Sequence, residues 1–158
     1  MDAVGFLQVF FAAMTPVGEL RISIPIGIHI LDLPWYQVLP ISIIGNLLPV
    51  LLLVPCLHVG AIWLRKYPTF LTKMLDWRAA SLLHTHNNQF AKYGPVFLVF
   101  LVAIPLPMTG AWTGSLASWV FGIPARKSIL LIAVGIVIAG TIVTVLTETG
   151  IKIGGVLT

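Results

Sequence analysis

Residues 103–115, AIPLPMTGAWTGS, lie in the middle of the uncharged window 93–125. This window is long enough to cross a bilayer, for which about 20 apolar residues suffice. Its centre nevertheless holds two prolines, two Thr-Gly pairs and a serine, which are poorly suited to an ordinary spanning helix. Ile104 and Leu106 each precede a proline, which disfavours α conformation and should end the entering helix. The window is therefore predicted to form two helices joined by a break.

The composition indicates that the chain lies in a membrane. Of its 158 residues, 58% are hydrophobic and 9% are charged, whereas soluble domains carry about 25% charged residues. The net charge of +4 could suggest a nucleic-acid partner. The basic residues lie beside apolar runs, however, as the positive-inside rule describes for membrane proteins, so no nucleic-acid partner is expected. The single cysteine, Cys56, favours neither a disulfide nor a Cys-based zinc site.

Hydrophobic runs and polar breaks divide the chain into five segments of one membrane domain. These are a region of two short apolar runs at 3–31, a transmembrane helix at 35–64, a basic linker at 65–92, a broken apolar region at 95–121 and a transmembrane helix at 126–148. Pro40, Pro49 and Pro55 predict that the first transmembrane helix is kinked or broken. Residues 70–83 of the linker fit an amphipathic helix lying at the cytoplasmic interface.

The sidedness of charge decides how the two broken regions meet the membrane. Each apolar run of 3–31 would form about 15–18 Å of helix, against a hydrocarbon core of about 30 Å, so neither run can cross alone. If 95–121 enters and leaves on one face, Arg126 and Lys127 lie on the same side as the five cations of the linker, as the positive-inside rule requires. Both regions are therefore predicted to be re-entrant hairpins. The linker is then cytoplasmic, and both termini lie on the outer face.

An internal repeat at an offset of 90 residues relates the two halves. The matched pairs are Phe10 with Phe100, Pro34 with Pro124, and Gly45 with Gly135. Each half reads as two short apolar runs around a broken tip, then a proline, then a long helix. The predicted fold is an all-α integral membrane protein: an inverted repeat of two re-entrant helical hairpins and two long transmembrane helices, plus the linker helix. This arrangement is typical of transporters that bind substrate near the midplane.

Two stretches carry a resemblance to a known family. TPVGELRISIPIGI (15–28) and KYGPVFLVFLVAIPLPMTGAWTGSLAS (92–118) resemble the small multidrug export protein family, a distant branch of the DedA (SNARE-associated-like) membrane protein superfamily. The resemblance covers nearly the whole chain. It implies two re-entrant hairpins that meet in the bilayer of a prokaryotic cytoplasmic membrane. It also implies transport of a substrate such as a polyprenyl-phosphate lipid carrier.

Glu19 and Arg21 lie between the two apolar runs of the first hairpin, and Thr15 precedes them. A charge within a membrane costs at least about 2.5–3.5 kcal/mol, so these side chains should face a cavity or a partner. Residues two apart on a helix do not face each other, so an extended or turn tip is expected at Glu19 and Arg21, which Gly18 allows. One interpretation is a structural ion pair or a tip wetted by water. In the other, Arg21 binds an anionic headgroup and Glu19 carries a coupling proton.

The opening stretch is expected to supply the other half of the site. Thr109 and Thr113 can cap a returning helix that starts around 110–115, and its N-terminus would present N–H groups to an anion at membrane depth. The first hairpin would do the same near 21–25. The alternative is that the small residues only pack the hairpin against a helix. The remaining candidates are Gly110, Trp112, Gly114, Ser115 and Asn46.

Three functions are compatible with these residues. The preferred one is a flippase or secondary transporter of an amphipathic, anionic substrate such as a lipid phosphate, possibly coupled to protons or another ion. The alternatives are a proton-coupled exporter of cationic drugs and a non-transporting assembly factor. An enzyme is not expected, because the sequence has no nucleotide-binding loop or nucleophile elbow, and no cofactor or metal is expected either. A homo-oligomer surrounded by membrane lipids is expected, because so small a bundle would need partners to enclose a path.

Overall fold

The computed structural model describes residues 3–64, 89–105 and 110–150, and within these ranges every regular element is a helix. The elements are α1 (Ala3–Met14), α2 (Glu19–Pro25), the π-helix η1 (Ile26–Ile30), α3 (Trp35–Leu64), α5 (Gln89–Ala103), α6 (Ala111–Val120) and α7 (Ala125–Glu148). The prediction of an all-helical chain is confirmed. The expected interfacial helix at 70–83 lies outside the described residues. Helix α5 begins at Gln89, inside the segment assigned to the linker, and continues through Pro95.

Two of the helices are long and apolar enough to cross a membrane, as predicted. With a rise of about 1.5 Å per residue, α3 is about 45 Å long and α7 about 36 Å. Helix α3 continues through Pro40, Pro49 and Pro55 without a break, so the alternative of a broken helix is wrong. Prolines are tolerated inside apolar helices because neighbouring groups can satisfy the carbonyls that they leave unpaired.

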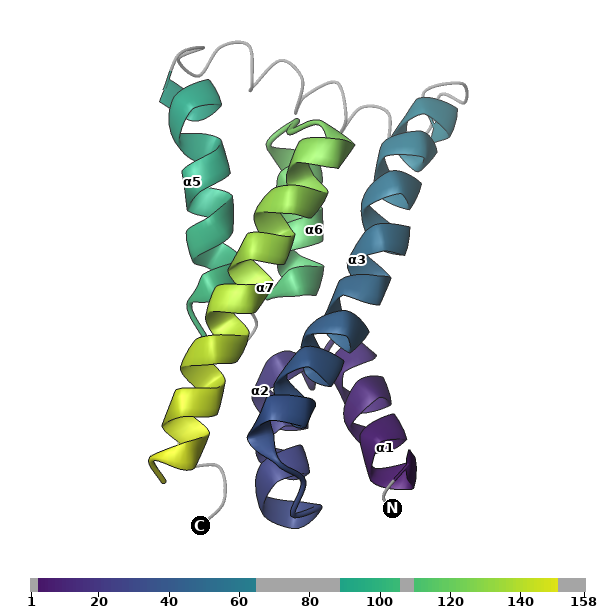
Figure 1. The fold of residues 1–158 in the computed structure, drawn as a ribbon. Helices are drawn as coiled ribbons and strands as arrows, with labels where there is room; N and C mark the ends of the chain where they lie inside the picture. Colours follow the sequence, from purple (N-terminus) through teal and green to yellow (C-terminus); the bar gives the residue numbers. More distant parts are fainter. Residues whose placement is uncertain (1–2, 65–88, 106–109, 151–158) are drawn as a thin grey trace.

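The short helices form two pairs at opposite ends of the long helices. In Figure 1, α1 and α2 lie beside the lower half of α3, whereas α5 and α6 lie beside the upper half of α7. Each pair starts at its own end of the bundle, turns near the middle and returns to the same end (Figure 1). Helix α2 continues directly into η1, with Pro25 at the change from α to π geometry. The turn of the first pair and the start of α6 therefore lie close together about halfway along the bundle.

Each pair packs against a long helix at a glycine. A Cβ added at Gly45 of α3 would lie 2.6 Å from the carbonyl oxygen of Phe10 in α1. A Cβ added at Gly135 of α7 would lie 2.6 Å from the Cβ of Val102 in α5. Small residues of this kind allow helices in membranes to approach closely. The side chains that form the core are Val9, Leu20, Ile24, Leu33, Val38, Val50, Val54, Leu98, Val102, Ala111, Ile123, Ile132, Ile136, Ala139 and Val143.

Replacing Gly135 with alanine is expected to lower the free energy of unfolding by about 1–3 kcal/mol, because α5 must move away from α7. The matched control is Gly60→Ala in α3, where no described atom lies within 4 Å of the added Cβ. That control should leave stability unchanged or raise it by about 1 kcal/mol, because alanine favours a helix. Unfolding of the purified variants in mixed micelles measures both. Equal stabilities for the two variants would contradict close α5–α7 packing.

Histidines and charges mark the two ends of the bundle. His29 donates from Nε2 to the Thr147 carbonyl at 3.1 Å, and this bond ties η1 to the end of α7. At the opposite end, Nε2 of His58 lies 3.0 Å from the Ile123 carbonyl, just before α7 begins.

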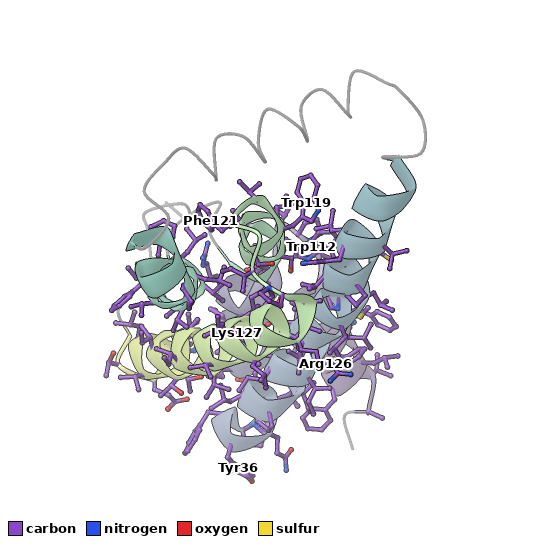
Figure 2. The ribbon with its side chains drawn as sticks, turned by 90° about the horizontal axis from the view of Figure 1, so that it is seen from above. Tyr36, Trp112, Trp119, Phe121, Arg126 and Lys127 are labelled. Carbon is purple, nitrogen blue, oxygen red and sulfur yellow. The ribbon has the colours of Figure 1, made fainter. Side chains whose placement is uncertain are left out.

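Exposed charges of opposite sign lie at the two ends of the bundle. Figure 2, which looks down the bundle, shows Arg126 and Lys127 at the start of α7. Both cations are exposed, and the carboxylates of Asp32 and Glu148 are exposed where α3 begins and α7 ends.

Candidate functional site

The turn of the first helix pair is closed by Thr15. Its hydroxyl donates to the Ala12 carbonyl at 2.8 Å and accepts from the Gly18 N–H at 3.0 Å. An extended or turn tip was expected at Glu19 and Arg21. The turn spans only 15–18, so this expectation is wrong for the two charged residues, which lie in the first turn of α2. Gly18 itself has ordinary right-handed backbone angles. The turn needs a glycine here for lack of space, because an added Cβ would lie 2.6 Å from the Thr15 hydroxyl oxygen. Glu19 takes the unusual conformation instead, with a φ of +44°.

The carboxylate of Glu19 caps the N-terminus of α6. Its Oε2 accepts a hydrogen bond from the Ala111 N–H, and its Oε1 accepts one from the Trp112 N–H, both at 3.3 Å. The first N–H groups of a helix have no partner within the helix, and the positive end of the helix dipole favours a negative charge there. A left-handed backbone is uncommon for a residue other than glycine. We infer that the two hydrogen bonds hold Glu19 in it.

Gly110 makes room for this contact. It is the N-cap residue of α6, and it provides no side-chain cap of its own. Its φ of +153° is one that residues with a side chain rarely adopt, and an added Cβ would overlap the Glu19 carboxylate. The helix start at Ala111 falls within the predicted range of 110–115. The expected threonine caps are not supported: Thr113 lies inside α6, and Thr109 lies outside the described residues.

A further hydrogen bond joins the end of α1 to the start of α6. The indole Nε1 of Trp112 donates to the carbonyl of Met14, the last residue of α1, at 3.3 Å. Figure 2 shows Trp112 and Trp119 on the side of α6 that faces α3. The end of α1 and the start of α2 therefore contact the start of α6 through three hydrogen bonds, two to the Glu19 carboxylate and one to the Met14 carbonyl.

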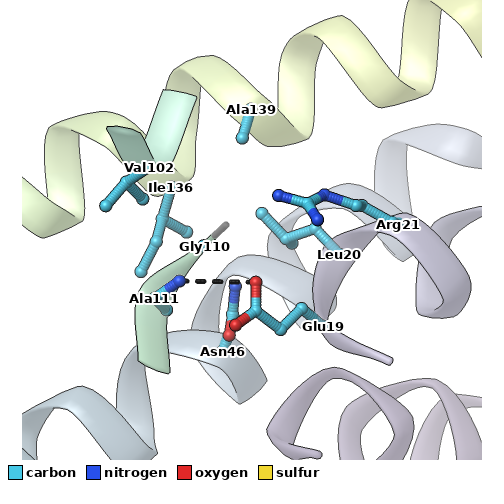
Figure 3. A pocket seen from close by; sticks show the side chains of 9 residues that line it. All are labelled: Glu19, Leu20, Arg21, Asn46, Val102, Gly110, Ala111, Ile136 and Ala139. Atoms are coloured by element: carbon cyan, nitrogen blue, oxygen red, sulfur yellow. Dashed lines mark hydrogen bonds between the residues drawn. The ribbon is translucent and has the colours of Figure 1, made fainter. Parts of the chain in front are cut away.

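A small pocket lies beside the Glu19 cap (Figure 3). Its cavity volume is about 10 Å³, and the empty space amounts to about 220 Å³ when the open region outside the pocket is counted as well. Glu19 is only 8% exposed and Asn46 only 1% exposed. Arg21 is half-buried, and its charge attracts the Glu19 carboxylate. The residues that line the pocket are Glu19, Leu20, Arg21, Asn46, Val102, Gly110, Ala111, Ile136 and Ala139.

The pocket brings together four of the residues expected from the sequence, namely Glu19, Arg21, Asn46 and Gly110. Trp112 contributes its backbone N–H and its indole to the contact between the turns.

The other expected residues lie elsewhere. Thr15 closes its own turn and is exposed, and Thr113 is exposed on α6. Gly114 packs against Val102, where a Cβ would lie 2.5 Å from a side-chain methyl group. The Ser115 hydroxyl donates to the Ala111 carbonyl, one turn earlier in α6, at 2.7 Å.

Sequence reasoning missed five residues that line the pocket: Leu20, Val102, Ala111, Ile136 and Ala139. Ala111 acts through its backbone N–H, which no side-chain pattern can reveal. The other four are aliphatic residues in aliphatic segments, so no contrast with their neighbours marks them. In the first hairpin, a helix was expected to start near 21–25, and it begins earlier, at Glu19.

Comparison with known proteins identifies the family. The family model described as "Putative small multi-drug export protein" matches residues 19–142, which is more than half of the chain. The chain belongs to this family. The match begins at Glu19 and contains every residue that lines the pocket. No curated protein and no solved structure matches this small multidrug export family member. With two helices long enough to span, it is a membrane protein.

Proposed function

We propose that this membrane protein is a proton-coupled transporter of an amphipathic anion, such as a polyprenyl-phosphate lipid. One observation carries the proposal: the N–H groups at the start of α6 bind a carboxylate, with a guanidinium lining the same pocket. Oriented N–H groups at a helix N-terminus bind phosphate and carboxylate alike. The family's description as export proteins supports a role in transport.

The position of the pocket supports transport across a bilayer. Asn46 lies near the middle of the apolar window Trp35–Gly60, and Ile136 lies near the middle of α7. We propose that both helix pairs are re-entrant hairpins, which places the pocket near the midplane. Transporters commonly bind substrate there, at the ends of discontinuous helices. The corresponding glycine contacts, α1 on Gly45 and α5 on Gly135, support an inverted repeat.

The donors at the start of α6 hold one anion at a time in this scheme. In the resting state that anion is the Glu19 carboxylate. When Glu19 takes up a proton it loses its charge and leaves these donors, and the anionic headgroup of the substrate replaces it. Arg21 then balances the charge of the headgroup. A proton and an anion therefore bind together, and they move in the same direction.

Charge at the two ends supports the proposed orientation. Arg126 and Lys127 lie at the end of the bundle where α5 begins, and Asp32 and Glu148 lie at the opposite end. Under the positive-inside rule the first end is cytoplasmic, so both termini lie on the outer face of a prokaryotic plasma membrane. Lipids and further copies of the chain are the proposed neighbours of its exposed apolar side chains.

Replacing Arg21 with alanine is expected to reduce transport of a lipid phosphate about ten- to a hundredfold. A hydrogen bond to a charged group is worth about 1.5–3 kcal/mol, which corresponds to this range in affinity. The measurement is the movement of a fluorescent lipid with a phosphomonoester headgroup across proteoliposome membranes. The control is Arg126→Ala, which removes an exposed cation at the start of α7 and should leave transport unchanged.

A second function is favoured by the family description and by the buried carboxylate: export of cationic drugs in exchange for protons. The same vesicles can be tested with ethidium, a cationic drug. In the preferred scheme, Arg21→Ala strongly reduces movement of the lipid phosphate, and ethidium does not move at all. Ethidium transport that depends on Glu19 and survives Arg21→Ala would establish the second function and overturn the first.

A further inference from the structure

Asn46 is a buried amide on an otherwise apolar part of α3. Its side chain is 1% exposed, and its Oδ1 atom has no hydrogen-bond partner among the described residues. Leaving a buried acceptor unpaired costs about 1–3 kcal/mol, and most such atoms in proteins are paired. Leucine, with a similar volume, would avoid this cost. The amide is therefore explained best by a hydrogen-bond donor that reaches it in another state of the protein.

The pocket limits which group this donor can be. Asn46 and Glu19 line the same pocket, and Figure 3 shows the Asn46 amide pointing toward the Glu19 carboxylate. Among the described residues, Arg21 of α2 is the only charged or titratable residue besides Glu19 that lines it. Figure 3 shows the Arg21 guanidinium directed toward Ala139 of α7. The other described residues that line it, apart from Leu20, are Val102, Gly110, Ala111, Ile136 and Ala139 of α5, α7 and the start of α6, and their side chains carry no donor.

We propose that Asn46 Oδ1 accepts the hydrogen bond of protonated Glu19, so that the two side chains form the proton-binding site of the transporter. A proton from water adds to one oxygen of the Glu19 carboxylate, and the resulting O–H donates to Asn46. A neutral carboxyl group is a poor partner for the N–H groups of Ala111 and Trp112, so they become available to an anion. Glu19 thus changes partners between α6 and α3.

This inference rests on the proposed function, because it names the residues that hold the coupling proton. It makes the coupling ion a proton rather than a metal cation, since the positive charge of Arg21 in the same pocket opposes a bound cation. Asn46 acts as a positioning residue, through Glu19. Its role can therefore be tested on Glu19 directly, without measuring transport.

Infrared difference spectroscopy on the full chain in lipid nanodiscs, between acidic and alkaline pH, provides the test. The wild-type protein should show a carboxylic acid C=O band that is missing in Glu19→Gln. In Asn46→Leu the same band should persist but lie at a different wavenumber, because its O–H has lost the acceptor. The control Gln37→Leu removes an exposed amide from the same helix and should leave the band in place.

Thermal unfolding of Asn46→Leu separates this role from a structural one. The variant should be at least as stable as the wild type, because it removes an unpaired buried acceptor. A folded Asn46→Leu protein whose Glu19 band does not move would overturn the assignment, as would a clear loss of stability. A band that moves in a protein without any transport would keep the Glu19–Asn46 pair and refute only the proposed function.

Discussion

Replacing Glu19 with alanine is expected to lower the free energy of unfolding by about 3 kcal/mol and to abolish transport. The change removes both hydrogen bonds that cap α6, each of which involves a charged group and is worth about 1.5–3 kcal/mol. It leaves two buried N–H groups without a partner. Helix α6 has only 10 residues, too few to be stable without packing and capping. Denaturant unfolding in mixed micelles and lipid-phosphate transport in proteoliposomes measure the two effects.

Glu19→Gln separates capping from proton binding. The amide oxygen can still accept one N–H, so the loss of stability should be smaller, about 1–2 kcal/mol. Transport should be lost as completely as in Glu19→Ala, because an amide cannot take up and release a proton. The matched control is Glu148→Gln, an exposed carboxylate at the end of α7. Proton-coupled transport that persists in Glu19→Gln would rule out Glu19 as the proton carrier.

Replacing Gly110 with alanine is expected to be nearly as damaging. The new Cβ would overlap the Glu19 carboxylate, and alanine would have to adopt a φ of +153°. Backbone strain of this kind costs about 1–3 kcal/mol, and overpacking costs a similar amount. We expect a loss of about 3 kcal/mol in the free energy of unfolding, with transport lost as well. The control is Gly94→Ala in α5, where no described atom lies within 4 Å of the added Cβ.

A double-mutant cycle tests whether the clash with Glu19 is the cause. Once Glu19 is alanine, the carboxylate is absent, and Gly110→Ala should cost only the backbone strain. The two changes should therefore be less damaging together than the sum of their separate effects, by about 1 kcal/mol or more. If the effects simply add, the close approach of Gly110 to Glu19 does not contribute to stability.

The class of fold was predictable because it depends on composition and length. A chain with 9% charged residues cannot cover itself with polar groups, and runs of 20 or more apolar residues form helices because the backbone must satisfy itself in lipid. The bounds of α3 and α7 agree closely with the segments read from the sequence. Prolines were less informative. Those of α3 lie within a continuous helix, whereas Pro105 follows the end of α5.

Of the residues that line the pocket, the charged and polar ones and Gly110 were predictable from the sequence. Glu19, Arg21 and Asn46 stand out because polar groups in an apolar segment are costly and need a partner. The partners of Glu19 were not predictable, because Ala111 and Trp112 lie in a distant segment. The cap of α6 comes from Glu19, 92 residues before Ala111. Thr113, one of the two threonines that the motif suggested as local caps, lies inside the helix.

Local chemistry therefore set the helices, the end of α5 before Pro105 and the position of a charge, Glu19, in an apolar segment. Tertiary packing alone placed the carboxylate on the N-terminus of α6, and made Gly110 necessary there. The physical reason is that a helix end accepts any anion at hydrogen-bond distance, and a local pattern cannot show which distant group will reach it. The N-terminus of α6, in the second helix pair, is capped by a side chain of the first pair.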